Sequence, residues 1–232
     1  MKQELSFKEY EKRIDAEGLV WEKKQQPEKA LEAYDLLMHE IENARPEAPQ
    51  EVKEKDAIVS YLMLRKAGIL MEAEKIGEAE VLMRGSVELA ERSGNATVVG
   101  RSKLGLGVYY GSTGKVEEAE KLLADALEMF SGKSDYDSQQ GAGWCLLNLG
   151  GLQLKKSNLK EAEEKLTKAI ELLKKIENWV GVGTAYEMMA KASKAKNDHK
   201  SAKENLLKAI EFYKKEGMNE KADLLRNELK TL

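Results

Sequence analysis

The sequence contains few of the residues that interrupt helices or cross-link chains. Of its 232 residues only three are proline, namely Pro27, Pro46 and Pro49, and all three lie near the N-terminus. No proline occurs from Glu51 to Leu232, which favours long helices and argues against a β fold rich in loops. The one cysteine, Cys145, excludes an internal disulfide framework and a metal site built from several cysteines.

A strong charge of one sign and a long apolar run are also missing. The net charge of −3 gives no general attraction to nucleic acid or to anionic membranes. No stretch approaches the ~20 apolar residues that a membrane-spanning helix needs. The first residues, MKQELSFKEYEK, are charged and lack the apolar core of a signal peptide. We therefore expect a cytoplasmic protein that binds neither nucleic acid nor a membrane.

Residues suited to catalysis or metal binding are scarce. The two histidines, His39 and His199, fall in segments far apart in the chain, and neither accompanies Cys145 in one repeat to activate it. Carboxylates are abundant, but they alternate with lysines as on the solvated face of a helix. The sequence therefore predicts no catalytic residue, no metal site and no cofactor, and we do not expect an enzyme.

The chain instead contains an internal repeat, marked by an alanine that recurs in five similar segments. The five anchor alanines are Ala30, Ala79, Ala119, Ala162 and Ala202. Twelve residues before each anchor stands a small residue: Gly18, Ala67, Gly107, Gly150 and Ala190. Four residues after each anchor stands a large one: Tyr34, Met83, Leu123, Leu166 and Leu206. Because two helices approach closely only where a small residue faces a large side chain, the pattern predicts helical hairpins.

The third segment carries the clearest motif. It reads Leu106-Gly107 followed by Tyr110, and then Ala119, Leu123 and Ala126 at helical spacing. This motif resembles the tetratricopeptide repeat family, although the usual repeat is about 34 residues and the anchors here are 40 or more residues apart. The chain thus resembles the extended-repeat type. The resemblance implies an all-α fold, a right-handed α–α superhelix of about five helical hairpins with a C-terminal capping helix.

The expected domain is a single solenoid over residues 1–232. Its repeats are expected at 6–43, 51–92, 96–131, 136–176 and 179–215, with the capping helix at 219–232. The segment from Asn43 to Asp56, which holds two prolines, is expected to be the one substantial linker.

The resemblance also implies a binding surface, because the first helix of each hairpin lines the concave face in this family. Eleven residues carried over to this groove form the candidate site: Tyr61, Leu64, Arg65, Met71, Arg101, Leu104, Val108, Trp144, Leu147, Asn148 and Lys191. Gly68, Gly105, Gly111 and Gly151 are expected to leave room for a bound backbone. We expect a non-enzymatic scaffold or adaptor whose protein or peptide partner is an extended peptide or amphipathic helix with apolar anchors and some acidic character.

Three alternatives remain open from the sequence. The same apolar residues are also suited to ordinary packing between repeats. They are suited to self-association as well, which would make the chain a structural module that forms a homodimer. RNA binding, as in the related pentatricopeptide arrays, ranks lower, because those arrays are basic and regular whereas this chain is slightly acidic and unevenly spaced.

Overall fold

The computed structural model describes residues 6–46 and 48–232, with every side chain except that of Lys23. The first five residues and Glu47, which belong to the expected domain 1–232, lie outside this range. Within it every regular element is helical and no β-strand occurs. No helix in this part of the chain combines the length and the apolar character needed to cross a membrane.

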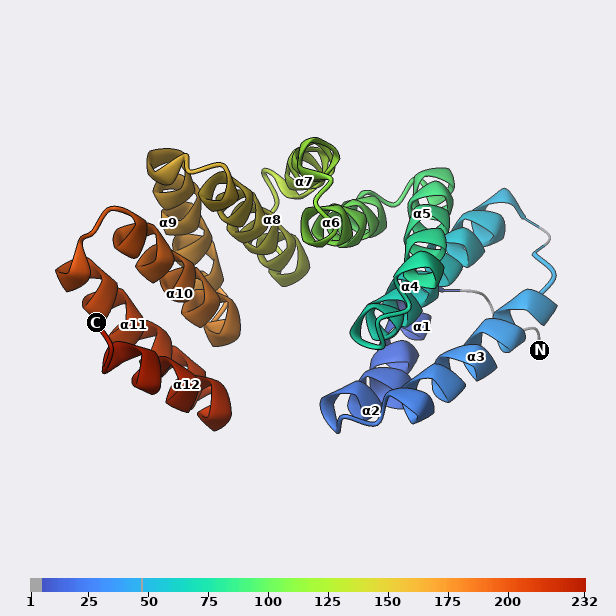
Figure 1. The fold of residues 1–232 in the computed structure, drawn as a ribbon. Helices are drawn as coiled ribbons and strands as arrows, with labels where there is room; N and C mark the ends of the chain where they lie inside the picture. The colour runs from blue at the N-terminus through green and yellow to red at the C-terminus, as the bar shows by residue number, and fades with distance from the viewer. Residues whose placement is uncertain (1–5, 47) are drawn as a thin grey trace. The chain divides into compact units, whose positions relative to one another are not determined.

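The helices follow one another as hairpins along the chain (Figure 1). They are α1 (Phe7–Ile14), a π-helical segment η1 (Asp15–Leu19), α2 (Val20–Lys23), α3 (Pro27–Asn43), α4 (Pro49–Glu72), α5 (Ile76–Ser93), α6 (Ala96–Ser112), α7 (Val116–Phe130), α8 (Tyr136–Lys155), α9 (Leu159–Lys175), α10 (Trp179–Ala195), α11 (His199–Lys215) and α12 (Asn219–Leu229). The expected fold class, an all-α array of helical hairpins followed by a C-terminal helix, is confirmed.

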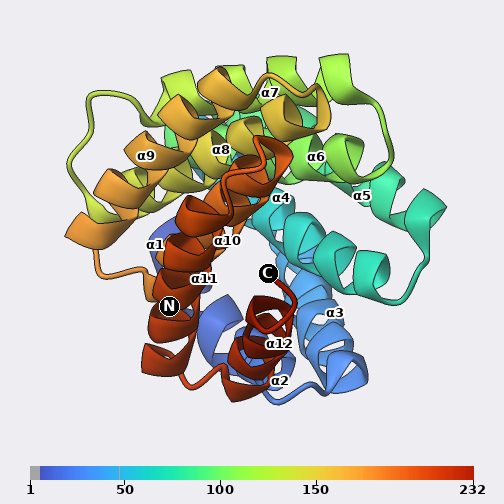
Figure 2. The ribbon, with the colours of Figure 1, turned by 60° about the vertical axis from the view of Figure 1, so that its left-hand side comes forward.

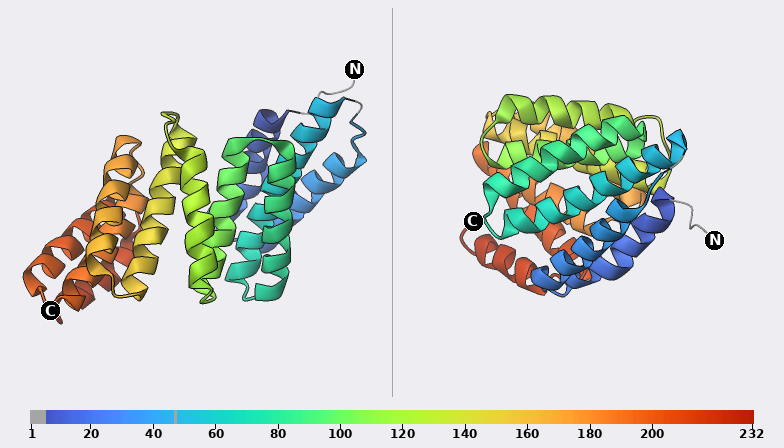
Figure 3. Two further views of the ribbon diagram at one scale, coloured as in Figure 1. Left: turned by 90° about the horizontal axis from the view of Figure 1, so that it is seen from above. Right: turned by 90° about the vertical axis from the view of Figure 1, so that its right-hand side faces the viewer.

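The chain divides into two compact units, residues 1–109 and 110–232, and the boundary lies within α6. In unit 1, α4 packs against α5, α3 and α1. In unit 2, α8 packs against α9, α10 against both α9 and α11, and α11 against α12. The α10–α11 pair is in the foreground of Figure 2. The helices within each unit lie side by side in Figure 3. The single domain over 1–232 stays a prediction.

The repeat columns lie in the cores of these hairpins. All five anchor alanines have 0% exposure, and the five large side chains four residues later are buried as well. The small residue of each column is needed where it faces that large side chain. A Cβ atom added to Gly18 would lie 1.9 Å from the Tyr34 ring, and one added to Gly150 would lie 2.9 Å from Leu166. The steric reason for the small and large columns is therefore confirmed.

Glycines also allow close packing at the start of α8 and α10. A Cβ on Gly141 would lie 2.5 Å from the Phe130 ring of the preceding hairpin. Leu173 is held in the same way on two sides, because a Cβ would lie 2.6 Å from it at Gly143 and 2.8 Å from it at Gly181. One large side chain near the end of α7 or α9 thus fits against the next hairpin only because glycine stands opposite.

The turn inside each hairpin has the same left-handed residue five positions before the anchor. These residues are Gln25, Glu74, Gly114, Ser157 and Asn197, with φ angles of 55°, 60°, 86°, 62° and 58°. The next residue's N–H donates to the carbonyl five positions earlier at 2.9 Å in all five turns, as from Lys75 to Leu70. This is the hydrogen bond of a Schellman motif, which satisfies a carbonyl at the helix end.

The expected linker from Asn43 to Asp56 is wrong in its extent. Helix α4 begins at Pro49, so only residues 44–48 separate it from α3. Proline lacks an N–H and has a fixed φ, and the first turn of a helix tolerates both properties. A proline that was interpreted as part of a loop thus starts the longest helix.

Candidate functional site

The candidate site of unit 1 is built around Tyr61 on α4. Its ring meets the Phe7 ring of α1 edge to face, with centroids 6.2 Å apart at 71°. The Arg101 guanidinium of α6 lies 5.4 Å from the centroid of the Tyr61 ring, and the same guanidinium forms an ion pair with Glu11 of α1. Burial raises the pKa of the Tyr61 hydroxyl. Tyr61 and Arg101 are therefore brought together, and they connect α1, α4 and α6.

Arg65 lies one turn further along α4 and belongs to a second set of polar contacts. It forms an ion pair with Glu22 of α2, and the Tyr34 hydroxyl donates a hydrogen bond to the same carboxylate. Burial and this bond to Glu22 raise the pKa of the Tyr34 hydroxyl. The Arg65 guanidinium is thus engaged inside unit 1.

The expected preference for an acidic ligand loses its support in these contacts. Arg65 and Arg101 are neutralised by Glu22 and Glu11. In unit 2, Lys191 forms an ion pair with Glu187 at 2.9 Å. A cation that already has a carboxylate partner gains little from a second one, since the first pair must be weakened. The acidic character of the ligand therefore stays a prediction, against which these ion pairs count.

The expected room for a bound backbone exists at one of the four glycines. A Cβ added to Gly68 would meet no heavy atom within 4 Å. At Gly105 the Leu64 side chain already fills the space, 2.3 Å from such a Cβ. Leu152 would be in tight contact with a Cβ at Gly111, at 3.3 Å, and Met188 would be in ordinary van der Waals contact with one at Gly151, at 3.4 Å. Only Gly68 is open, and Leu64 is partly used to pack α4 on α6.

The remaining apolar candidates of unit 1 are half-buried. Met71 lies near the end of α4, and Leu104 and Val108 lie one turn apart on α6. Half-buried apolar side chains beside an open glycine can be covered further by a ligand. We define the α4–α6 surface as Tyr61, Leu64, Gly68, Met71, Leu104 and Val108.

In unit 2 the candidates are more deeply involved in the core. Leu147 has 2% exposure and belongs to the core formed by α8, α9 and α10, so a ligand cannot reach it. Trp144 is half-buried against the same core, and its carbonyl accepts a hydrogen bond from the Asn148 side chain at 2.8 Å. The assignment of Leu147 to a binding surface is thus corrected: it is a packing residue.

Glu187 lies in this region at a position that the family resemblance assigns to the concave face, although it is not one of the eleven candidate residues. Burial raises its pKa, but hydrogen bonds from Lys191 and Tyr213 outweigh that effect and lower it. Lys221 of α12 also lies 3.3 Å from it. Glu187 thus ties α10 to α11 and to the capping helix, a structural role that only the folded arrangement reveals.

Among the described residues, the cysteine and the possible metal ligands were the candidates for chemistry. Cys145 is fully buried, and burial raises the pKa of its thiol to about 12, which keeps it protonated. Among the described residues, no three histidine, cysteine, aspartate or glutamate side chains are grouped to hold a metal ion.

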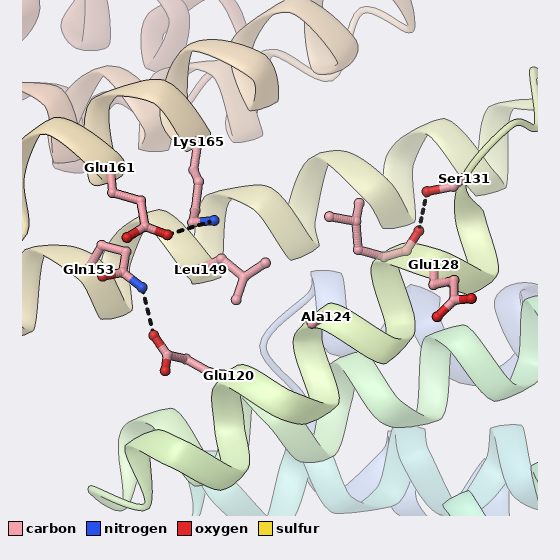
Figure 4. A pocket seen from close by; sticks show the side chains of 9 residues that line it. Glu120, Ala124, Glu128, Ser131, Leu149, Gln153, Glu161 and Lys165 are labelled. Atoms are coloured by element: carbon pink, nitrogen blue, oxygen red, sulfur yellow. Dashed lines mark hydrogen bonds and ion pairs between the residues drawn. The ribbon is translucent and has the colours of Figure 1, made fainter.

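A hollow of about 550 Å³, not predicted above, lies among α7, α8 and α9 (Figure 4). Its polar side chains already bind one another: Gln153 donates to Glu120 at 2.6 Å, and Lys165 pairs with Glu161 at 3.1 Å. A second hollow, of about 470 Å³, lies in unit 1 and is lined largely from equivalent positions of the repeat. Leu31 and Leu70 stand there at the positions of Glu120 and Gln153. These hollows follow from the repeat geometry.

Comparisons with known proteins place the chain among helical repeat proteins. Two profiles described as Tetratricopeptide repeat match residues 142–215 and 99–130. No curated protein sequence matches the chain.

Solved structures match most of its length. BtubC (BKLC) from P. vanneervenii is 17% identical with a TM-score of 0.62, over 89% of this chain and 80% of that one. The apo form of RapI is 12% identical with a TM-score of 0.61, over 96% and 71%. A putative kinesin light chain of Podosopora anserina with TPR-like repeats is 16% identical with a TM-score of 0.59, over 93% and 98%. At such identities the likeness concerns the fold alone.

Proposed function

Since this chain belongs to the tetratricopeptide repeat family, we propose that it is an adaptor that holds a segment of another protein on the α4–α6 surface. Arrays of this family are in general protein-interaction scaffolds without catalytic activity. Stacked helical hairpins offer an extended surface to a partner, and the partner segment adds its own apolar face to it.

The open space at Gly68 is the observation that carries the proposal. Tyr61, Leu64 and Met71 lie on the same helix, and Leu104 and Val108 on the next first helix of a hairpin, all half-buried. Large apolar side chains around a vacant position favour a pocket for one anchoring side chain of the partner. Because Arg65 and Arg101 are already paired, the segment binds by its apolar face rather than by acidic residues.

The test fills this space without disturbing the fold. Gly68→Leu places a side chain where the partner would bind. The control, Gly77→Leu, adds the same side chain to α5, outside the α4–α6 surface, at a glycine where an added Cβ would also meet no heavy atom within 4 Å. Both changes remove a glycine from a helix and so favour the helical state, by about 0.8 kcal/mol at Gly68 inside α4 and by less at Gly77 in the first turn of α5. Neither variant is therefore expected to destabilise the fold.

Wild type and both variants are used as bait for proteins of a native lysate, with thermal unfolding measured alongside. We expect partners that bind wild type and Gly77→Leu but are lost with Gly68→Leu. Recovery of the same partners by all three proteins would refute binding at the α4–α6 surface.

Self-association through the same residues is the rival function. Light scattering at two concentrations separates the two, because a dimer held by the α4–α6 surface dissociates on dilution or in the Gly68→Leu variant. A monomer at both concentrations argues against the homodimer.

A further inference from the structure

Unit 2 carries a stack of three aromatic rings on α10 and α11 that the proposed function does not use. The rings of Trp179 and Phe212 have centroids 5.5 Å apart and are inclined by 12°. The rings of Tyr186 and Phe212 are 5.8 Å apart and nearly parallel at 3°. All three side chains are half-buried against the core of α8, α9 and α10. Their edges therefore form part of the surface of unit 2.

Three lysines from α9 and α11 surround this stack. The Lys215 ammonium lies 3.5 Å from the centroid of Trp179, and that of Lys208 lies 5.2 Å from the centroid of Tyr186. The Lys174 ammonium lies 5.4 Å from the Tyr186 centroid and donates to the Tyr186 hydroxyl at 3.2 Å. We call these six residues the aromatic–lysine cluster. Rings at these distances attract the ammonium charge, which restrains long and flexible side chains.

These three lysines lack the ion pairs with glutamate that other lysines of unit 2 form. Six other lysines of unit 2 have a glutamate partner: Lys156, Lys165, Lys191, Lys194, Lys196 and Lys221. Among the described residues no carboxylate forms an ion pair with Lys174, Lys208 or Lys215; Glu171 and Glu211, on the same helices, are exposed and form none with them. Three positive charges thus lie beside apolar rings, and no ion pair engages them among the described residues, although Glu171, Glu204 and Glu211 lie within one helical turn of them.

The ring faces decide which anionic partner this cluster can take. A nucleic acid would need a free ring face on which to stack a base. Here the inner faces are covered by other rings, and Trp179 and Tyr186 also carry lysines. The ammonium groups keep N–H donors for carboxylates, and the ring edges can be covered by apolar side chains. Charge complementarity therefore favours an acidic peptide segment.

We propose that the aromatic–lysine cluster is a second docking site, which binds an acidic segment of a partner protein with apolar residues between its carboxylates. This site is distinct from the α4–α6 surface, since it consists of other residues. It also selects an acidic segment, whereas the α4–α6 surface binds a segment by its apolar face. Binding here is sensitive to ionic strength, because the attraction acts between partly exposed charges.

The test measures the anisotropy of a fluorescein-labelled peptide made of glutamate and leucine, titrated with the full chain. The variant Lys174→Gln/Lys208→Gln/Lys215→Gln removes the three charges. A control variant, Lys160→Gln/Lys200→Gln/Lys203→Gln, removes the same charge from exposed positions of α9 and α11 outside the cluster. Circular dichroism establishes that both variants keep their helix content.

We expect saturable binding to wild type that weakens as salt is added. The cluster variant should bind about tenfold more weakly, since three exposed ion pairs contribute roughly 0.5 kcal/mol each, and the control variant should bind as wild type does. No binding to wild type, or an equal loss in both variants, would overturn the proposal. So would a labelled oligouridylate that binds in place of the peptide and is lost in the cluster variant.

Discussion

At the residue scale, the carboxylate of Glu40 on α3 couples the stability of unit 1 to pH. Both of its oxygens accept from the Arg13 guanidinium, at 2.7 and 2.8 Å, and one also accepts from the Tyr10 hydroxyl at 2.6 Å. The bonds from Arg13 and then Tyr10 lower its pKa from 4.5 to about 2. Such a bidentate pair stabilises the ionised form of the carboxylate.

The folded chain therefore holds this carboxylate ionised at a pH where the unfolded chain protonates it. The stabilisation is complete above 4.5 and disappears as the pH falls toward 2. We expect Glu40→Gln to lower stability at neutral pH and to lose less stability than wild type on acidification from about pH 5 to about pH 3. Urea unfolding at the two pH values measures this. Glu42→Gln, an exposed change on the same helix, is the control, and identical pH profiles for wild type and Glu40→Gln would contradict the assignment.

At the element scale, the contact between consecutive hairpins of unit 2 depends on glycine. Gly141 leaves space for the Phe130 ring, and Gly181 leaves space for Leu173. Phe130 and Leu173 are themselves buried, so they cannot swing into solvent to make room. A methyl group at either glycine must displace a packed helix.

Gly141→Ala should therefore destabilise unit 2 by about 1–3 kcal/mol, which is the usual cost of overpacking. The comparison change Gly77→Ala, at an open position in the first turn of α5, should not destabilise and should raise stability by less than the ~0.5–1 kcal/mol seen in the middle of a helix. Denaturant unfolding of both variants provides the measurement. The double variant Gly141→Ala/Phe130→Leu should lose less stability than the sum of the losses in the two single variants, because the smaller side chain relieves the contact. Full additivity would show that the ring is not the obstacle.

At the scale of the whole molecule, the two compact units should respond separately to a local change. Trp21 reports on unit 1, whereas Trp144 and Trp179 report on unit 2. Repeat proteins are held together by contacts between neighbours, so cooperativity across the chain is limited. We expect Gly141→Ala to shift the unfolding midpoint seen by Trp179 more than that seen by Trp21, with tryptophans isolated by replacing the others with phenylalanine. Equal shifts at both probes would instead support the single domain predicted over 1–232.

The sequence predicted the hairpins well because their steric columns are regular. Ala162 and Leu166 are separated by one helical turn, and the pattern recurs five times. The candidate site was harder to predict, because the partner that neutralises Arg101 is Glu11, ninety positions away in the chain. Leu147 was misjudged for a related reason: its burial, at 2% exposure, depends on packing among α8, α9 and α10 that the sequence spacing alone does not reveal.

The left-handed turn inside each hairpin offers a way to engineer the protein. Four of the five turns place a residue with a side chain in that conformation, which costs such residues about 1–2 kcal/mol. Replacement by glycine removes this cost in the folded chain. Part of the gain is lost again, because glycine raises the conformational entropy of the unfolded chain. We expect Glu74→Gly to raise the free energy of unfolding by about 0.5–1 kcal/mol, as measured in urea, while Glu88→Gly inside α5 lowers it by about 1 kcal/mol.

Ser157→Gly should add a similar gain and Asn197→Gly a smaller one, because asparagine already tolerates the left-handed conformation. These gains should add, since the turns have the same backbone hydrogen bond and lie far apart in the chain. A thermostable version of this repeat protein could therefore be made at its turns, leaving both proposed binding surfaces in their native form.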